Sequence, residues 1–335
     1  MGNTAPAGNG DDTSKQKKKT GGLFKVSPYM VIPSRVGGFS LYLKQDGNLV
    51  LYAEKGELFT PNHVERLSKL DVEHLYVKAE DYSHYATYVQ SNILELLDDE
   101  SIPVRERARA WNDATVSLAS EAFNRSLPKS MDKRRFKKIH SLIKSSLKFF
   151  ARDDALKELS RFIKEGNELF RHGIGTMVLT ITVLSTFVKD DSDLLVAVGI
   201  GAMLHDIGKL ELPEELFTRR NLSQTDIEMI KSHPALGVGI CSSLPLPQQT
   251  LQCILFHHER EDGSGYPSGA LGELLPTYVK VLSLCNVYDN LTRGAPGHKQ
   301  LTPFEALTRI KSMRNAFDPD MLKRLIAVLS KAELT

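Results

Sequence analysis

The stretch VAVGIGAMLHDIGK, residues 196–209, decides the fold of the C-terminal half of this 335-residue chain. It belongs to an apolar run that starts near Asp193 and is shorter than the roughly 20 residues of a membrane span, so it predicts a buried helix. His205 and Asp206 stand at the end of this helix. A buried histidine and carboxylate are costly to desolvate without a partner; a metal ion satisfies both, although a helix terminus can also hold such a pair. The stretch therefore predicts a helical domain with a metal site.

Other side chains of the ligand type lie on both sides of this pair. Five of the ten histidines fall between residues 172 and 258. The candidate metal ligands are Glu168, His172, His205, Asp206, His233, His257 and His258. Glu168 and His172 share one helix face, where they bind an ion or form a surface pair. His233 is either a ligand or a core or capping residue, whereas His257 and His258, about 100° apart on a helix, suit two neighbouring ions.

These nitrogen and carboxylate donors come without thiolates, because Cys241, Cys253 and Cys285 are odd in number and lack metal-type spacing. Such donors favour Fe, Mn or Zn. A centre of two or three ions can hold phosphate oxygens and activate water for attack on phosphorus. The loop DGSGYPSG, residues 262–269, directly follows the paired histidines and can place backbone amides and Tyr266 against a nucleotide. The residues therefore predict hydrolysis of a phosphoester.

Three motifs, HDIGK at 205–209, HHE at 257–259 and DGSGYP at 262–267, together resemble the HD-GYP branch of the HD phosphohydrolases over about residues 150–330. The resemblance implies an all-helical domain with a bi- or trinuclear Fe or Mn site that hydrolyses cyclic di-GMP to pGpG or GMP. By position it implies metal ligands at His172, His205, Asp206, His233, His257, His258 and Asn286, with Glu168 binding a third ion. It also implies that Asp206 bridges two ions and Lys209 contacts a substrate phosphate, both as catalytic residues. Gly265, Tyr266 and Pro267 match substrate-binding positions.

Three positions depart from the family pattern. Asn286 stands where the family commonly has Asp, so it offers only a neutral carbonyl oxygen, and Asp289 follows it; either Asn286 faces the ions or Asp289 serves them. Residues 219–221 replace a Lys-Pro-Gly stretch that is one residue longer, and Glu261 replaces an aromatic residue. Three hypotheses stay open: a cyclic di-GMP phosphodiesterase, a weakened domain that binds cyclic di-GMP and reports it to a partner, or a hydrolase of another nucleotide such as cyclic GMP-AMP.

The N-terminal half predicts a different architecture. Residues 39–43 and 48–53 alternate apolar and polar side chains around Asp46-Gly47, which indicates a hairpin. Thr60 and Pro61 begin a helix that runs to about Leu70, and residues 74–78 form a returning strand. The fold class is therefore α+β: a disordered tail (1–23), a small α/β module with a regulatory role (24–80), a helical connector (81–150) and an all-α HD-type catalytic domain (151–335). Helices are expected near 153–188, 191–206, 223–243, 246–259, 276–292, 302–316 and 318–332.

Composition limits the partners. Lys and Arg number 43 against 41 for Asp and Glu, so the net charge of +2 does not favour nucleic acid. The N-terminus lacks an apolar segment, so no signal peptide, membrane anchor or membrane partner is expected, and the cytoplasm is the expected compartment. A cyclic dinucleotide is the expected ligand, and a homodimer or a signalling protein stays open as a further partner.

Overall fold

The structure is a computed structural model that describes residues 22–70, 72–124, 132–163, 169–219, 221–293, 299–313 and 315–334. The predicted tail, residues 1–23, falls almost entirely outside the described residues. The chain divides into two compact units, Met1–Tyr85 and Ala86–Thr335, and the division falls inside helix α2 (Tyr82–Asp98). None of the described helices is long and apolar enough to cross a bilayer.

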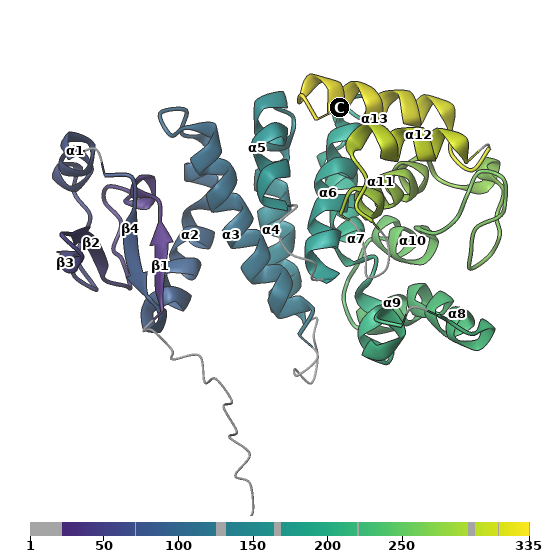
Figure 1. The fold of residues 1–335 in the computed structure, drawn as a ribbon, viewed down its shortest axis with the longest axis horizontal. Helices are drawn as coiled ribbons and strands as arrows, with labels where there is room; N and C mark the ends of the chain where they lie inside the picture. The colour runs from purple at the N-terminus through teal and green to yellow at the C-terminus, as the bar shows by residue number, and fades with distance from the viewer. Residues whose placement is uncertain are drawn as a thin grey trace, which may run out of the picture. The chain divides into compact units, whose positions relative to one another are not determined.

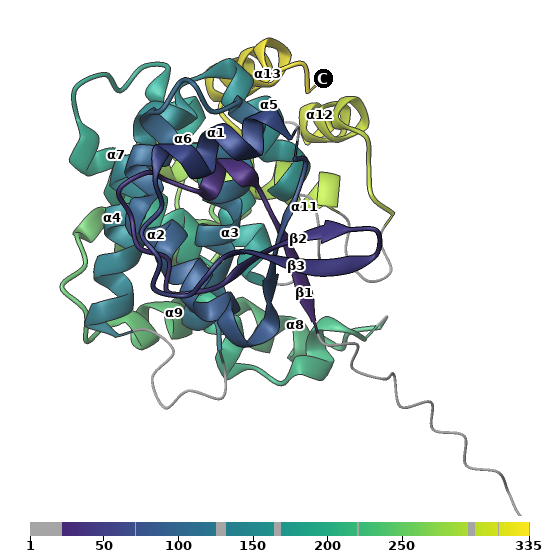
Figure 2. The same cartoon turned by 90° about the vertical axis from the view of Figure 1, so that its left-hand side faces the viewer.

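The first unit is an antiparallel sheet with one helix. Its elements are β1 (Leu23–Val26), β2 (Leu41–Gln45), β3 (Asn48–Ala53), α1 (Pro61–Lys69) and β4 (Leu75–Lys78), and the sheet order is β1-β4-β2-β3. The sheet and α1 can be followed in Figure 2. The predicted hairpin is confirmed: Asp46 and Gly47 both have positive φ, 49° and 82°, as a tight hairpin turn requires. Helix α1 and strand β4 are confirmed too, whereas β1 was not predicted because four residues carry too little periodicity.

The second unit is helical. Its helices, drawn from blue through green to yellow in Figure 1, are α2, α3 (Val104–Ala122), α4 (Lys133–Phe150), α5 (Asp153–Ile163), α6 (Leu169–Ser185), α7 (Ser192–Leu204), α8 (Gln224–Lys231), α9 (His233–Cys241), α10 (Gln248–Phe256), α11 (Thr277–Arg293), α12 (Pro303–Ser312) and α13 (Pro319–Lys331). The α+β class with an all-helical C-terminal domain is thereby confirmed. Helices α3 and α4 pack against α6 and α7 within this unit, and the proposed boundary at residue 151 stays a prediction.

Helix α7 is the centre of this unit. Every residue from Leu195 to Leu204 is buried, and α7 packs against α4, α6 and α10. Glycines allow the close approach: a Cβ on Gly201 would lie 2.4 Å from Cys253 Cβ, and one on Gly173 would lie 2.3 Å from the carbonyl oxygen of Met203. The end of α7 is therefore held firmly in the core, and His205 follows it directly.

Two predicted helices differ from the observed ones. The helix expected at 223–243 was wrong, because it breaks at Ser232 into α8 and α9. Pro234 explains the break, since proline lacks an N–H and is favoured in the first turn of a helix. The break places His233 at the start of α9. The helix expected at 153–188 appears as α5 and α6, with residues 164–168 between them outside the described residues.

Candidate metal centre

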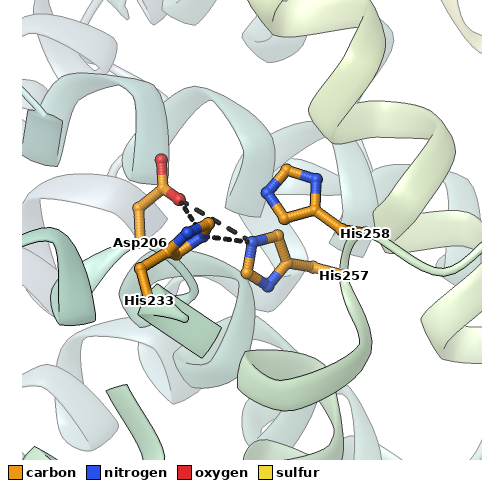
Figure 3. A group of neighbouring side chains, drawn as sticks. All are labelled: Asp206, His233, His257 and His258. Carbon is orange, nitrogen blue, oxygen red and sulfur yellow. Dashed lines mark hydrogen bonds and ion pairs between the residues drawn. The ribbon is translucent and has the colours of Figure 1, made fainter. Parts of the chain in front are cut away.

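Asp206 lies between two groups of histidines. One group is His172 and His205, and the other is His233, His257 and His258. The Asp206 Oδ2 atom is 3.5 Å from His205 Nε2 and 3.8 Å from His172 Nε2. Its Oδ1 atom is 3.2 Å from His233 Nε2 and 3.7 Å from His257 Nε2 (Figure 3). Each carboxylate oxygen therefore faces a different pair of imidazoles.

Backbone carbonyls fix the orientation of three of these rings. Because a carbonyl only accepts hydrogen bonds, the Nδ1 atom that faces it carries the proton. The three bonds run from His205 to Ala202 at 2.6 Å, from His233 to Ile230 at 2.6 Å and from His257 to Ile254 at 2.8 Å. Burial lowers the pKa of His205 to about 4 and that of His257 well below its usual range, so both rings are neutral at pH 7. Their Nε2 atoms are then lone-pair donors.

The Nε2 atoms of four of the rings lie close together in pairs. His172 Nε2 and His205 Nε2 are 3.1 Å apart, and His233 Nε2 and His257 Nε2 are also 3.1 Å apart. The Nε2 atom of His258 is buried and has no hydrogen-bond partner among the described residues. Acceptor atoms gathered around a buried carboxylate repel one another unless a cation lies among them. The donor set therefore fits divalent metal ions, with Asp206 common to both groups.

Lys209 supplies a positive charge beside this centre. It lies in the short 3-10 helix η3 (Ile207–Glu211), and its Nζ atom is 2.6 Å from Asp206 Oδ2. Burial alone would raise the pKa of the Asp206 carboxyl, but Lys209 and the neighbouring histidines hold it well below its usual range. Asp206 is therefore ionised, and 22% of the Lys209 side chain remains exposed.

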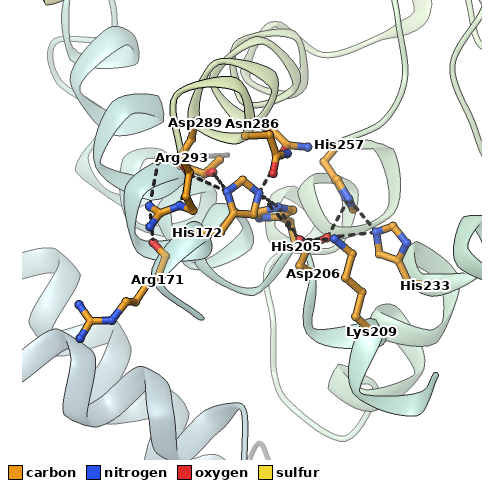
Figure 4. A network of polar contacts seen from close by, with 12 residues as sticks. Arg171, His172, His205, Asp206, Lys209, His233, His257, Asn286, Asp289 and Arg293 are labelled. Atoms are coloured by element: carbon orange, nitrogen blue, oxygen red, sulfur yellow. Dashed lines mark hydrogen bonds and ion pairs between the residues drawn. The ribbon is translucent and has the colours of Figure 1, made fainter. Parts of the chain in front are cut away.

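Asn286 and Asp289, on α11, approach His172 from opposite edges of its ring. Asn286 Oδ1 is 2.9 Å from His172 Nε2, the atom that faces the cluster. Asp289 Oδ2 is 2.7 Å from His172 Nδ1, the far edge of the ring (Figure 4). Asn290 Nδ2 donates to Asn286 Oδ1 at 2.8 Å, which holds the carbonyl oxygen toward the cluster. Of the two alternatives left open by the sequence, this arrangement favours Asn286 as the residue that faces the ions.

The Gly-Tyr-Pro loop packs directly on the centre. The Tyr266 ring stacks on His258 with centroids 4.5 Å apart and an angle of 20° between the planes. Gly265 allows this contact, because a Cβ there would lie 2.5 Å from the backbone oxygen of His258. The loop thus brings Gly265 and Tyr266 beside His258, and Pro267 follows Tyr266 directly in the chain.

Two residues hold the site in place in ways that the sequence did not predict. Glu259 is fully buried and accepts hydrogen bonds from the backbone N–H groups of Ser268 and Ala270, at 2.7 Å and 3.2 Å, so it fixes the loop. Its place after two histidines was the available signal. Asp289 was noticed only as an alternative ligand, although it contacts His172 away from the cluster. Glu168, expected to bind a third ion, lies outside the described residues.

Two further residues that depart from the family pattern form ion pairs with neighbouring side chains. Glu261 forms an ion pair with Lys280, with a 3.1 Å distance between Oε1 and Nζ. Arg219 pairs with Asp226, whose Oδ1 lies 3.3 Å from the Arg219 Nη1 atom. Both side chains therefore form local ion pairs, and neither belongs to the histidine and aspartate cluster.

The chain is similar in sequence to several curated phosphodiesterases. The chain is 26% identical over 175 residues to the cyclic di-GMP phosphodiesterase PA4108 of Pseudomonas aeruginosa, covering 52% of this chain and 42% of that protein. It is 31% identical over 131 residues to the cyclic di-GMP phosphodiesterase response regulator RpfG of Xanthomonas campestris, covering 38% and 35%. A 3'3'-cGAMP-specific phosphodiesterase 3 of Vibrio cholerae is 27% identical over 132 residues, covering 38% and 28%. The chain thus spans less than half the length of these curated relatives.

A solved structure shares the fold. Bd1817, described as an HDG"Y"P protein from Bdellovibrio bacteriovorus, superposes with a TM-score of 0.62 and 20% identity, covering 92% of this chain and 100% of that one. The family model for the HD domain matches residues 143–321, more than half of the 335 residues, and this range includes every described residue of the cluster. The chain therefore belongs to the HD domain family.

Proposed function

We propose that this chain is a metal-dependent phosphodiesterase that hydrolyses cyclic di-GMP to pGpG, GMP or both. The observation that carries the proposal is the position of Asp206, whose two carboxylate oxygens face two separate groups of imidazole nitrogens. A single structural salt bridge does not need a second group of ligands. An aspartate that bridges two ions does.

The ions would be Fe or Mn in a bi- or trinuclear centre held by His172, His205, Asp206, His233, His257, His258 and Asn286. Nitrogen and oxygen donors without thiolates suit these metals. When bound, such ions hold phosphate oxygens and lower the pKa of water, which supplies a nucleophile at neutral pH. The third ion would need Glu168.

The residues around the cluster are suited to a phosphate ester of a nucleotide. Lys209 places an ammonium group beside Asp206, where it can neutralise a non-bridging phosphate oxygen. Tyr266 is held by its stacking on His258 and lies under Lys231, whose Nζ is 5.5 Å from the ring centroid. An aromatic ring and lysines beside a metal centre offer contacts to the base and the phosphates of a cyclic dinucleotide.

A second candidate function follows from Asn286. Its neutral oxygen replaces a carboxylate charge at the cluster and already contacts His172 and Asn290. A domain with weakened metal affinity would bind cyclic di-GMP and report it to a signalling partner without turnover. A third candidate is cyclic GMP-AMP as the substrate, which is motivated by the Vibrio cholerae relative.

Purified protein prepared without oxygen tests these candidates. Metal content is measured first, and products are then identified after incubation with cyclic di-GMP or cyclic GMP-AMP, beside a binding measurement for each. We expect bound metal and hydrolysis of cyclic di-GMP by the wild type, and neither in Asp206→Ala, which loses the ligand common to both groups. Binding without products supports the reporter function instead, and preferential hydrolysis of cyclic GMP-AMP supports the third candidate.

A further inference from the structure

A buried arginine stands behind the metal centre. Arg293 ends α11, and only 6% of its side chain is exposed. Its Nε atom donates to Asp289 Oδ2 at 2.9 Å, and its Nη2 atom donates to Asp289 Oδ1 at 3.3 Å. Asp289 Oδ2 in turn lies 2.7 Å from His172 Nδ1. Guanidinium, carboxylate and imidazole thus form a continuous chain that reaches a candidate metal ligand from its far edge (Figure 4).

The same guanidinium also holds two backbone carbonyls outside α11. Its Nη1 atom donates to the oxygen of Ile163, the last residue of α5, at 3.1 Å. Its Nη2 atom donates to the oxygen of Arg171, the residue before His172 in α6, at 3.2 Å. Arg293 therefore contacts both the carboxylate that orients the His172 ring and the backbone to which that ring is attached.

The packing around this chain leaves little freedom. A Cβ on Gly175 would lie 2.3 Å from Asp289 Oδ1 and 2.9 Å from Arg293 Nη2, so only glycine lets α6 come this close. The Asp289 carboxylate is therefore held between the His172 ring and the Arg293 guanidinium.

We infer that Arg293 is a positioning residue of the metal centre, which acts through Asp289 and through the backbone of Arg171 to aim His172 Nε2 at the ions. This inference rests on the metal centre of the proposed function and is independent of the substrate. A carboxylate that accepts from the second nitrogen of a ligand histidine fixes its tautomer and raises its basicity. Arginine suits the position because its planar fork serves a carboxylate and two carbonyls at once, which a lysine ammonium cannot do with the same geometry.

The test measures Co(II) binding to the metal-free full-length chain, by competition with a chelator and by the absorption spectrum of the bound ion. Arg293→Lys keeps the charge and removes the fork, and we expect it to weaken Co(II) binding by about 10–100-fold and to change the spectrum. Asp289→Asn, nearly identical in size, should do the same. In the double variant the Co(II) affinity should fall by less than the product of the two single fold-changes, because both residues act through the His172 ring.

Arg161→Lys is the matched control. Arg161 pairs with Glu158 through Nη1 at 2.8 Å on the surface of α5, and 54% of its side chain is exposed. Its Co(II) affinity and spectrum should equal those of the wild type. The melting temperature of each metal-free variant separates a folding defect from a coordination defect.

Each of the following results would overturn the inference about Arg293 or decide it by a second variant. Unchanged affinity and spectrum in Arg293→Lys overturn the inference, as does a loss of affinity that follows a lower melting temperature with no spectral change. If Arg293→Lys does not fold, Asp289→Asn decides by the same criteria. If the wild type binds no Co(II), both the inference and the proposed metal centre are overturned. If the wild type binds Co(II) and Arg293→Lys binds it with the same affinity, only the inference is overturned.

Discussion

His172 Nε2 and His205 Nε2 lie 3.1 Å apart, although the Nδ1 atom of each ring already faces an acceptor of its own, Asp289 and the carbonyl of Ala202. Burial lowers the pKa of His205 to about 4, so this ring is neutral at pH 7 and its Nε2 atom presents a lone pair toward His172. His233 and His257 repeat the arrangement on the other side of Asp206. A surface network of salt bridges would place donors opposite acceptors, so this arrangement is typical of a site built for cations.

Lys209→Ala should lower turnover much more than stability. The ammonium faces a carboxylate at the cluster and not a core group, and its loss removes one preorganised charge from the reacting phosphate. We expect a decrease in kcat/KM of about 10²–10³-fold for cyclic di-GMP, with metal content unchanged. Lys323→Ala, at a surface pair with Asp320, is the control. Normal specific activity in the folded fraction of Lys209→Ala would assign the lysine to folding alone.

Asn286→Asp should increase metal retention during dialysis against a chelator. The substitution adds a charge at nearly constant size beside His172 Nε2, and hard divalent cations prefer a carboxylate to a neutral carbonyl. Turnover should rise as well if metal occupancy limits it. Gln248→Glu adds the same charge at an exposed position at the start of α10 and controls for the general field. Equal retention in wild type and Asn286→Asp would contradict a ligand role for this position.

The metal-free protein should lose stability as the pH falls. The pKa of His205 is lowered from 6.5 to about 4 by burial in the folded state, so the unfolded chain takes up this proton first. The contribution of the neutral His205 ring to the free energy of unfolding is present above pH 6.5 and is lost as the pH falls toward 4. The full loss is about 3 kcal/mol. Urea unfolding at pH 7 and pH 4.5 measures it. His205→Asn cannot be protonated there and should show a smaller pH dependence; an equal dependence would exclude His205 as its source.

Gly265→Ala should raise the KM for cyclic di-GMP with little effect on metal content. The added methyl group would lie 2.5 Å from the backbone oxygen of His258, so the loop that carries Tyr266 must shift away from the cluster. Gly239→Ala is the control, because a Cβ at Gly239 meets nothing within 4 Å. Steady-state kinetics and metal analysis of both variants check this. An unchanged KM in Gly265→Ala would show that the position of this loop does not affect substrate binding.

Much of the site was predictable because its parts are local in sequence. The apolar run before His205 predicts a buried helix, and HDIGK, HHE and DGSGYP each keep their chemistry within a few residues. The hairpin at Asp46-Gly47 is equally local, since the turn depends on two residues with positive φ. By contrast, the helix break at Ser232 was missed, although Pro234 was visible, because apolar periodicity continued across it.

The sequence by itself determined which residue types could form a metal centre and which helix would carry the His-Asp pair. Only the tertiary structure decided which edge of His172 each polar residue of α11 approaches. Asn286 and Asp289 are three residues apart, on nearly the same helix face, so their spacing predicts that both come near the site but not in which role. Their roles depend on His172, which is 117 residues from Asp289 in the sequence, and on Gly175, which lets α6 and α11 approach closely enough for the contact.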